Sequence, residues 1–326
     1  MTLKQHYNIY IAACEKEGGI YLCNINDDGV LTCVEKYDLD SPMYLAVSNN
    51  KMYAILRNPF ENSVYSGLVS LDILNDGRLG DMSQMQSTMG EVACHLCVDD
   101  DVYCVNYISG SVIKMPDTLV THEGASVHPQ RQTSPHTHQV IFTPDKKYVC
   151  VVDLGIDTIV VYDRNLNLFS KANVPQGYGS RHMVFSPDGK YAFCINELKS
   201  SVTVFSYKDG VLTPIKTYDA VPEDFEGQNT GAAIRITSDG KYLYASNRGH
   251  DSIACFEVDE DKLSLIEYVS CGGSSPRDFN ITPDGKFVIC TNENSGNVTV
   301  FEIINGRLKK VSEQTGFERP LCVIFN

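Results

Sequence analysis

The sequence predicts an all-β fold, a seven-bladed β-propeller whose closing blade is shared by the two ends of the chain. The first observation is a recurring phrase: an apolar stretch, a polar turn related to Pro-Asp-Gly-Lys, and a second apolar stretch. The second is its period. The turn residues Asp145, Asp188, Asp239 and Asp284 lie 43, 51 and 45 residues apart, which is typical of propeller blades. The third is that the chain starts and stops part-way through a repeat.

The blades follow one another along the chain. Residues 7–11 and 19–25 read as the second and third strands of a blade. Degenerate copies of the turn at 47–53 and 98–103 mark the next two blades. Four regular copies follow at residues 141–148, 184–191, 236–242 and 281–287. Residues 319–325 match the start of a blade and stop before its turn, so we expect them to complete the N-terminal blade and remove its free sheet edges.

Composition limits the class of protein. With 326 residues and 43% hydrophobic content, one domain spanning residues 1–326 can bury a large core. No apolar run approaches the roughly 18 residues of a membrane span, and the first residues lack the apolar region of a signal peptide, so we expect a cytoplasmic protein without a membrane partner. The net charge of −14 also argues against a nucleic-acid partner.

Twelve cysteines are present, but their placement does not indicate a disulfide framework. Cys104, Cys194 and Cys290 occupy one repeat position in different blades, which suits small core residues in a reducing compartment. Cys94 and Cys97 have the spacing of half a zinc site, yet residues three apart in a strand face opposite ways and no second pair lies nearby. We therefore expect twelve free thiols, no metal and no cofactor.

The repeat also maps polar residues onto the fold. In a four-stranded meander the start of strand one and the end of strand two lie at the same end of the blade, around the mouth of the central channel. Before first strands come His136, His138, Arg181, His182, Arg277 and Arg319; after second strands come Arg57, Asn106, Asp153, Asn196, Glu197, Asn247, Arg248, Asn292 and Glu293. Arg235 lies within a first strand. This gathering of Arg and His in an acidic protein indicates a small anionic ligand.

Part of this pattern has a simpler explanation. The recurring Asn or Asp after strand two is expected to cap turns, and His250-Asp251 is expected to stabilise its own hairpin loop. His136, His138, Arg181, Glu197 and Arg248 differ, because the repeat does not require them. Residues that depart from a repeat on its binding face are the better candidates for chemistry.

Three segments carry a resemblance to a known family: Pro135–His138, Ser180–Leu198 and Tyr242–Ile253. With them the chain resembles the seven-bladed propeller lactonases, which include bacterial propeller-type 6-phosphogluconolactonases and the fungal carboxy-cis,cis-muconate cyclase. The resemblance extends over nearly the whole chain. Its more specific parts are Arg181-His182 with Asn196-Glu197 and the run Asn247–Asp251. The absence of Trp separates the chain from WD-repeat propellers.

The resemblance implies a lactonase that opens 6-phosphogluconolactone in the pentose phosphate pathway. The catalytic His, Arg, Glu and Arg proposed for the cyclase correspond to His138, Arg181, Glu197 and Arg248. We expect Glu197, with or without His138, to act as the base, and the two arginines to stabilise the oxyanion. Seven further residues are predicted to bind substrate: His136, His182, Arg235, Asn247, His250, Arg277 and Asn292.

Two other functions remain open at this point. The same groups could cyclise or open a carboxylated muconolactone, which is also anionic. A propeller without catalytic activity could instead use the arginine-rich mouth to bind an acidic metabolite.

Overall fold

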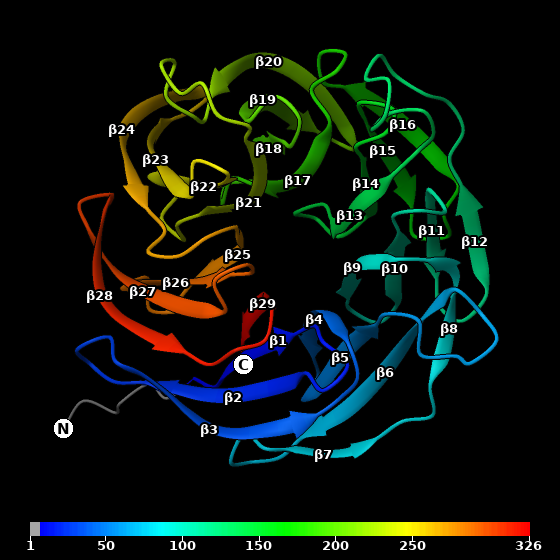
Figure 1. Cartoon of the computed structure of the whole chain (residues 1–326). Helices are drawn as coiled ribbons and strands as arrows, with labels where there is room; N and C mark the ends of the chain where they lie inside the picture. The colour runs from blue at the N-terminus through cyan, green and yellow to red at the C-terminus, as the bar shows by residue number, and fades with distance from the viewer. Residues whose placement is uncertain (1–6) are drawn as a thin grey trace.

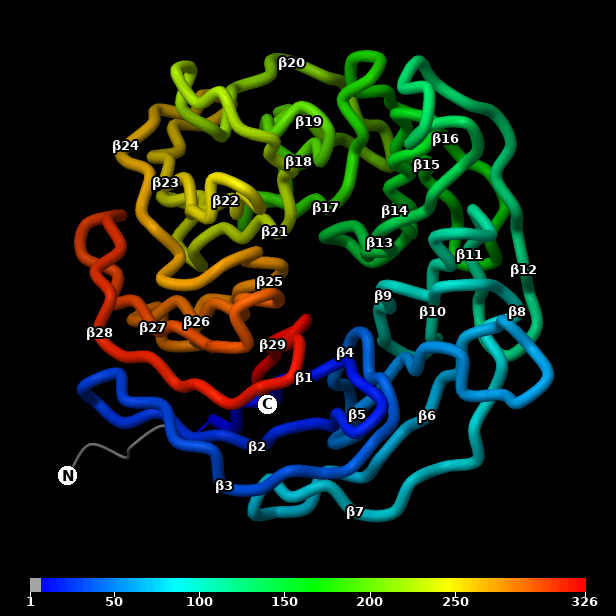
Figure 2. The backbone as a smooth tube through the Cα atoms, in the orientation of Figure 1, coloured from blue at the N-terminus to red at the C-terminus, as the bar shows by residue number. Residues whose placement is uncertain are grey.

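Seven antiparallel sheets surround a central axis, and this arrangement confirms the predicted seven-bladed β-propeller. The computed structural model describes residues 7–326. Figure 1 shows the first strand of every blade beside the axis, and Figure 2 traces the chain once around the ring from one terminus to the other. In the described residues no helix is long and apolar enough to cross a membrane.

The strands of each blade are hydrogen-bonded in sequence order, with two exceptions: the blade that the termini share, and the strand β8, which pairs with β6. That closing blade consists of β29 (Pro320–Phe325), β1 (Ile9–Ala13), β2 (Gly19–Ile25) and β3 (Leu31–Asp38). The next blade has β4 (Pro42–Ser48), β5 (Lys51–Leu56), β6 (Tyr65–Ile73), β7 (Leu79–Met82) and an additional β8 (Gln86–Glu91). The third has β9 (Ala93–Val98), β10 (Val102–Asn106), β11 (Ser111–Lys114) and β12 (Thr118–Thr121).

The four remaining blades follow the regular repeat. The first consists of β13 (Thr137–Phe142), β14 (Tyr148–Asp153), β15 (Thr158–Asp163) and β16 (Leu168–Asn173). The second consists of β17 (Ser180–Phe185), β18 (Tyr191–Asn196), β19 (Ser201–Lys208) and β20 (Val211–Asp219). The third consists of β21 (Thr230–Ile236), β22 (Tyr242–Arg248), β23 (Ser252–Asp259) and β24 (Lys262–Ser270). The last consists of β25 (Pro276–Ile281), β26 (Phe287–Asn292), β27 (Asn297–Ile304) and β28 (Arg307–Thr315).

The closing blade joins the termini as predicted. β29 pairs with β1 in antiparallel register, with Ile9 opposite Phe325 and Ile11 opposite Val323. The backbone amide of Asn8 donates to the carbonyl of Asn326 at 2.9 Å, and the reverse bond measures 3.1 Å. Without β29, the backbone donors and acceptors of β1 would lack partners on one side.

The Pro-Asp-Gly-type turns build the same hydrogen bonds in four blades. In the β17 blade, Asp188 Oδ1 accepts a bond from Ser186 Oγ at 2.6 Å and one from the amide of Lys190 at 3.1 Å. Asp145, Asp239 and Asp284 repeat both contacts. This short network explains why the turn sequence recurs, because a side-chain oxygen replaces a missing backbone partner.

The apolar core is divided among the contacts between neighbouring blades. Cys150 of β14 and Cys194 of β18 pack in one such cluster with Met183, and Cys290 packs in another. All twelve cysteines are free in the structure. Cys23 and Cys33 lie opposite each other on β2 and β3 with their sulfur atoms 2.7 Å apart, a contact that the repeat does not predict.

Candidate active site

Side chains that precede first strands and follow second strands meet at one end of the central channel. They enclose a cavity of about 230 Å³. Its walls are formed by Met43, Arg57, Val92, Cys94, Tyr107, Arg131, His138, Glu197, Arg248 and Arg277. Four guanidinium groups face one carboxylate here, so the cavity suits a small anionic ligand.

Glu197 lies at the centre of the site and pairs with three arginines. It follows β18 directly, and the amide of Gly231 donates to its carbonyl at 2.9 Å. Its Oε2 lies 3.0 Å from Arg181 Nε and 2.9 Å from Arg248 Nη2, and its Oε1 accepts a bond from Arg131 Nη2 at 2.5 Å. Burial opposes the charged form, but Arg248 and Arg181 hold the pKa of Glu197 far below its usual range. While all three arginines hold it, Glu197 is therefore a poor proton acceptor.

Two of these arginines are fixed by backbone carbonyls. Arg181 on β17 is 2% exposed and donates through Nη1 to the carbonyl of Ala232 at 2.6 Å. Arg248 at the end of β22 donates through Nη2 to the carbonyl of Gly231 at 3.1 Å. Burial, followed by the nearby charge of Arg248, lowers the pKa of Arg181 to about 9. Arg181 thus lies beneath Glu197 and supports it, whereas Arg248 also forms part of the cavity wall.

His138 is the second candidate base, and its ring is available. It lies on β13 and lines the cavity, and its Nδ1 has no hydrogen-bond partner in residues 7–326. Burial and the charge of Arg181 lower the pKa of His138 well below its ordinary value. The imidazole is consequently neutral near pH 7 and has a lone pair. The lowered pKa weakens it as a proton acceptor, and the negative charge of Glu197, which raises this pKa, offsets part of that effect. The ring of His182 lies 5.0 Å from that of His138, and the ring of His95 lies 5.3 Å from that of His182.

A separate group of cations lies across the cavity. Arg57 follows β5, and within the described chain no carboxylate pairs with it; its Nε is buried without a hydrogen-bond partner. Arg277 on β25 is 3.4 Å from Glu293 Oε2, and Glu293 also binds Arg319 at 2.7 Å. Among residues 7–326, Arg57 is thus a wall cation without an ion-pair partner, and a ligand anion in the cavity can pair with its charge.

Several predicted binding residues lie outside this cavity. Arg235 is below it in the channel, where Nη2 binds Asp278 Oδ1 at 2.8 Å, and His182 is buried between His138 and His95. His136 stacks on Tyr107 at 4.5 Å and supports the cavity wall from behind. These side chains shape the site, and the structure does not place them on its surface.

Asn247, Asn292 and His250 also have structural partners. The side chain of Asn247 donates to the carbonyl of Ala220 at 2.5 Å, and that of Asn292 donates to Thr299 Oγ1 at 3.3 Å. Both residues are fully buried. His250 Nδ1 lies 2.6 Å from Ser252 Oγ within the same hairpin. His250 thus stabilises its own hairpin, as expected. Asn247 and Asn292 instead join the ends of their strands to other segments, and this also occupies their side chains.

Arg131 and Tyr107 line the cavity but were not predicted as site residues, and Arg57 was placed at the mouth without a role. Arg131 belongs to the connection between β12 and β13, a stretch that has no equivalent in the other blades. Its Nη2 also donates to Tyr107 Oη at 3.3 Å. The available signal was that this unique stretch contains an arginine directly before a blade that contributes to the mouth.

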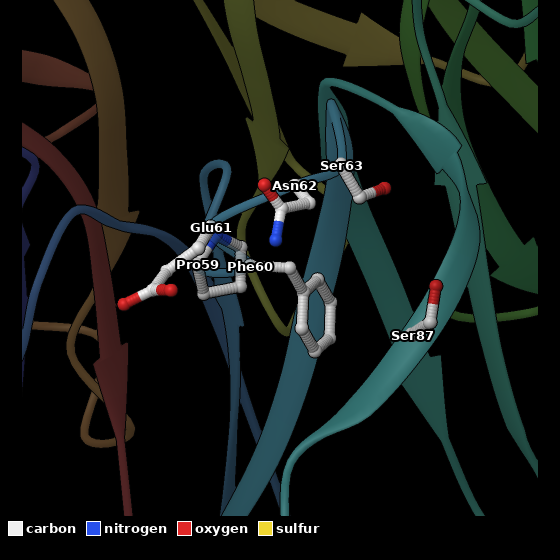
Figure 3. A pocket seen from close by; sticks show the side chains of 6 residues that line it. All are labelled: Pro59, Phe60, Glu61, Asn62, Ser63 and Ser87. Atoms are coloured by element: carbon white, nitrogen blue, oxygen red, sulfur yellow. The ribbon is translucent and has the colours of Figure 1, made fainter.

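A larger hollow of about 560 Å³ lies elsewhere, between Pro59–Ser63 and Ser87 (Figure 3). It is open to solvent, and its only charged side chain is Glu61, so it lacks the cations that an anionic ligand requires. Among residues 7–326 no group of three or more His, Cys, Asp or Glu side chains is arranged to hold a metal ion. The arginine-rich cavity is therefore the candidate active site.

Comparisons with known proteins agree with this geometry. Residues 8–325 match the family model "Lactonase, 7-bladed beta-propeller". An uncharacterized protein of Staphylococcus epidermidis is 35% identical over 295 residues, which cover 83% of this chain and 85% of that protein. Among solved structures, a candidate 6-phosphogluconolactonase from Bacteroides fragilis has a TM-score of 0.90 and 28% identity, covering 100% of this chain and 99% of that one. Periplasmic gluconolactonase PpgL from Pseudomonas aeruginosa has a TM-score of 0.89 and 26% identity, covering 98% and 99%.

Proposed function

Because the chain belongs to the seven-bladed propeller lactonase family, we propose that it hydrolyses a phosphorylated sugar lactone, 6-phosphogluconolactone, to 6-phosphogluconate. The neighbours named as gluconolactonases and candidate 6-phosphogluconolactonases support a sugar lactone as the substrate. The arginines of the cavity wall support a substrate that carries an additional negative charge.

The observation that favours a phosphorylated substrate is the unpaired Arg57. No carboxylate of the described residues neutralises Arg57, so a ligand anion can pair with it without displacing another group. A phosphate has about −1.5 to −2 charges near neutral pH and three strong acceptor oxygens. A phosphate paired with Arg57 would share the cavity with a lactone ring that contacts His138, Glu197 and Arg248.

Hydrolysis requires a proton acceptor for water and a positive environment for the carbonyl oxygen. In this proposal His138 accepts the proton of the attacking water as the water oxygen bonds to the lactone carbonyl carbon. Arg248 stabilises the oxyanion that forms there. The imidazolium of His138 is then stabilised by the Glu197 carboxylate, and its proton passes to the ring oxygen as the ester bond breaks.

The proposal is tested by separating binding from chemistry. Arg57→Gln should raise KM for 6-phosphogluconolactone by about tenfold or more, the scale of one lost charge-assisted hydrogen bond, while kcat changes little because the phosphate is held equally in the ground and transition states. KM for unphosphorylated gluconolactone should stay unchanged. An equal effect of Arg57→Gln on both lactones would contradict the assignment of Arg57 to phosphate.

Arg78→Gln is the matched control, because Arg78 is 60% exposed and pairs with Asp76 on the opposite face. Arg164 is unsuitable for this purpose. It pairs with Asp99 and Asp101 and packs over the ring of Phe142 at 4.6 Å, so its replacement would also affect stability.

A further inference from the structure

Arg131 is the one arginine bound to Glu197 that does not come from a repeated element. It lies in residues 122–136, the connection between β12 and β13. Its side chain is 37% exposed, compared with 2% for Arg181 and 16% for Arg248. Of the three guanidinium groups, Arg131 is therefore the one that a ligand entering from solvent meets first.

The backbone of this connection is firmly anchored, so that Arg131 can change its contacts through its side chain alone. Asp153, at the end of β14, binds His122 Nδ1 at 2.7 Å and the amide of His136 at 2.8 Å. Next to Arg131, Gln132 donates to the carbonyl of Leu154 at 2.8 Å. These buried contacts hold both ends of the connection and its centre against the β13 blade.

Within residues 7–326, the side chain of Arg131 has only two hydrogen-bond partners, and neither is a backbone group. They are Glu197 Oε1 at 2.5 Å and Tyr107 Oη at 3.3 Å. Arg181 and Arg248, in contrast, also donate to backbone carbonyls. If Arg131 leaves, both of them remain on Oε2, and Glu197 is not left as an unpaired buried charge.

A ligand anion in the cavity would compete directly for Arg131. Glu197 shares a single negative charge among three arginines, whereas a phosphate has about −1.5 to −2 charges. Arg131 and Arg57 both belong to the cavity wall. An anion in the cavity would pair with Arg131. Glu197 would remain ionised, because Arg181 and Arg248 still pair with its Oε2.

We propose that Arg131 is a specificity-determining residue that pairs with Glu197 in the free protein and transfers to the anionic group of the lactone when it binds. This inference rests on the proposed lactonase function and extends it. Transfer leaves Glu197 Oε1 free to stabilise positive charge on His138 as His138 accepts the proton of water. An anionic lactone thereby activates its own hydrolysis, and a neutral lactone of the same ring does not.

The test compares 6-phosphogluconolactone with gluconolactone in Arg131→Gln. For the phosphorylated lactone, kcat/KM should fall by about tenfold or more, as expected for one charge-assisted hydrogen bond. For gluconolactone, kcat should rise severalfold, because Glu197 Oε1 is already free. Arg131→Lys keeps the charge and should recover part of the preference for the phosphorylated substrate. Lys199→Gln, an exposed cation in the loop after β18, is the matched control and should behave as the wild type.

Two results would overturn the inference. One is an unchanged ratio of the two kcat/KM values in Arg131→Gln. The other is a gluconolactone kcat at or below that of the wild type, which would show that Arg131 does not restrain Glu197 or serves only to hold the loop.

Calorimetric titration with 6-phosphogluconate separates this inference from the proposed function. If the wild type binds 6-phosphogluconate but hydrolyses no lactone, the proposed function fails alone. If Arg131→Gln binds 6-phosphogluconate as tightly as the wild type, the inference fails alone. A loss of affinity of about tenfold in Arg131→Gln, with little change for gluconate, supports it.

Discussion

Replacing Glu197 with Gln should lower the free energy of unfolding by about 3–5 kcal/mol, the usual cost of removing one partner from a buried ion pair. The carboxylate lies 2.9 and 3.0 Å from Arg248 and Arg181, whose side chains are 16% and 2% exposed. Burial and Arg248 already lower the pKa of Arg181 to about 9 with Glu197 in place. Without Glu197, two desolvated guanidinium groups would face each other with no anion between them.

The assay is equilibrium urea unfolding followed by circular dichroism, since the chain has no Trp. Glu293→Gln is the matched control, because its partners Arg277 and Arg319 are 22% and 41% exposed. This variant should lose only about 1 kcal/mol of unfolding free energy. A loss of unfolding free energy in Glu197→Gln that is no larger than that in Glu293→Gln would contradict this prediction.

Three other predictions concern the ring, the channel and the thiols. Deleting residues 319–326 should expose β1 and cause aggregation detectable by light scattering; a soluble monomeric product would contradict edge closure. Burial lowers the pKa values of His95, His138 and His182, so the unfolded chain binds more protons than the native one. The free energy of unfolding should therefore fall as pH falls below about 6.5, by up to about 1.4 kcal/mol per pH unit for each histidine. Urea unfolding from pH 7.5 to 5.5 checks this, and a flat profile would contradict it. Protein denatured without a reductant should titrate twelve thiols. Mild oxidation of the native protein should join Cys23 to Cys33 first, because their sulfur atoms are 2.7 Å apart; peptide mapping that finds another pair first would contradict this.

The architecture could be predicted because the repeat encodes it locally. The hydroxyl and amide contacts of Asp188 need only the residues from Ser186 to Lys190, so each copy of the turn marks a blade without knowledge of its neighbours. β8 has no copy elsewhere, and no periodic signal could reveal that it pairs with β6. The connection at 122–136 has no counterpart in the other blades, and its path depends on distant residues such as Asp153.

The site could be predicted only in part, for a physical reason. The map identified His138, Glu197, Arg248 and Arg277 as residues of one mouth, and they share one cavity. It could not show which polar groups already have partners. Asn247 follows a second strand as Glu197 does, yet its amide is used by the carbonyl of Ala220.

The expected role of Glu197 shows the same limit. Its position after β18 made it the natural general base in the sequence. The structure surrounds it with three arginines from β17, β22 and the 122–136 connection, and their charges weaken its basicity. Partners of this kind arise from tertiary packing, which spacing along the chain does not encode.

The most direct test of the central claim is pH-stat measurement of acid release from freshly prepared 6-phosphogluconolactone, with and without the purified protein and with and without a chelator. We predict hydrolysis well above the spontaneous rate, a higher kcat/KM than for gluconolactone, and no loss of activity in the chelator. Release at the spontaneous rate, or activity that disappears in chelator and returns with one specific cation, would contradict it.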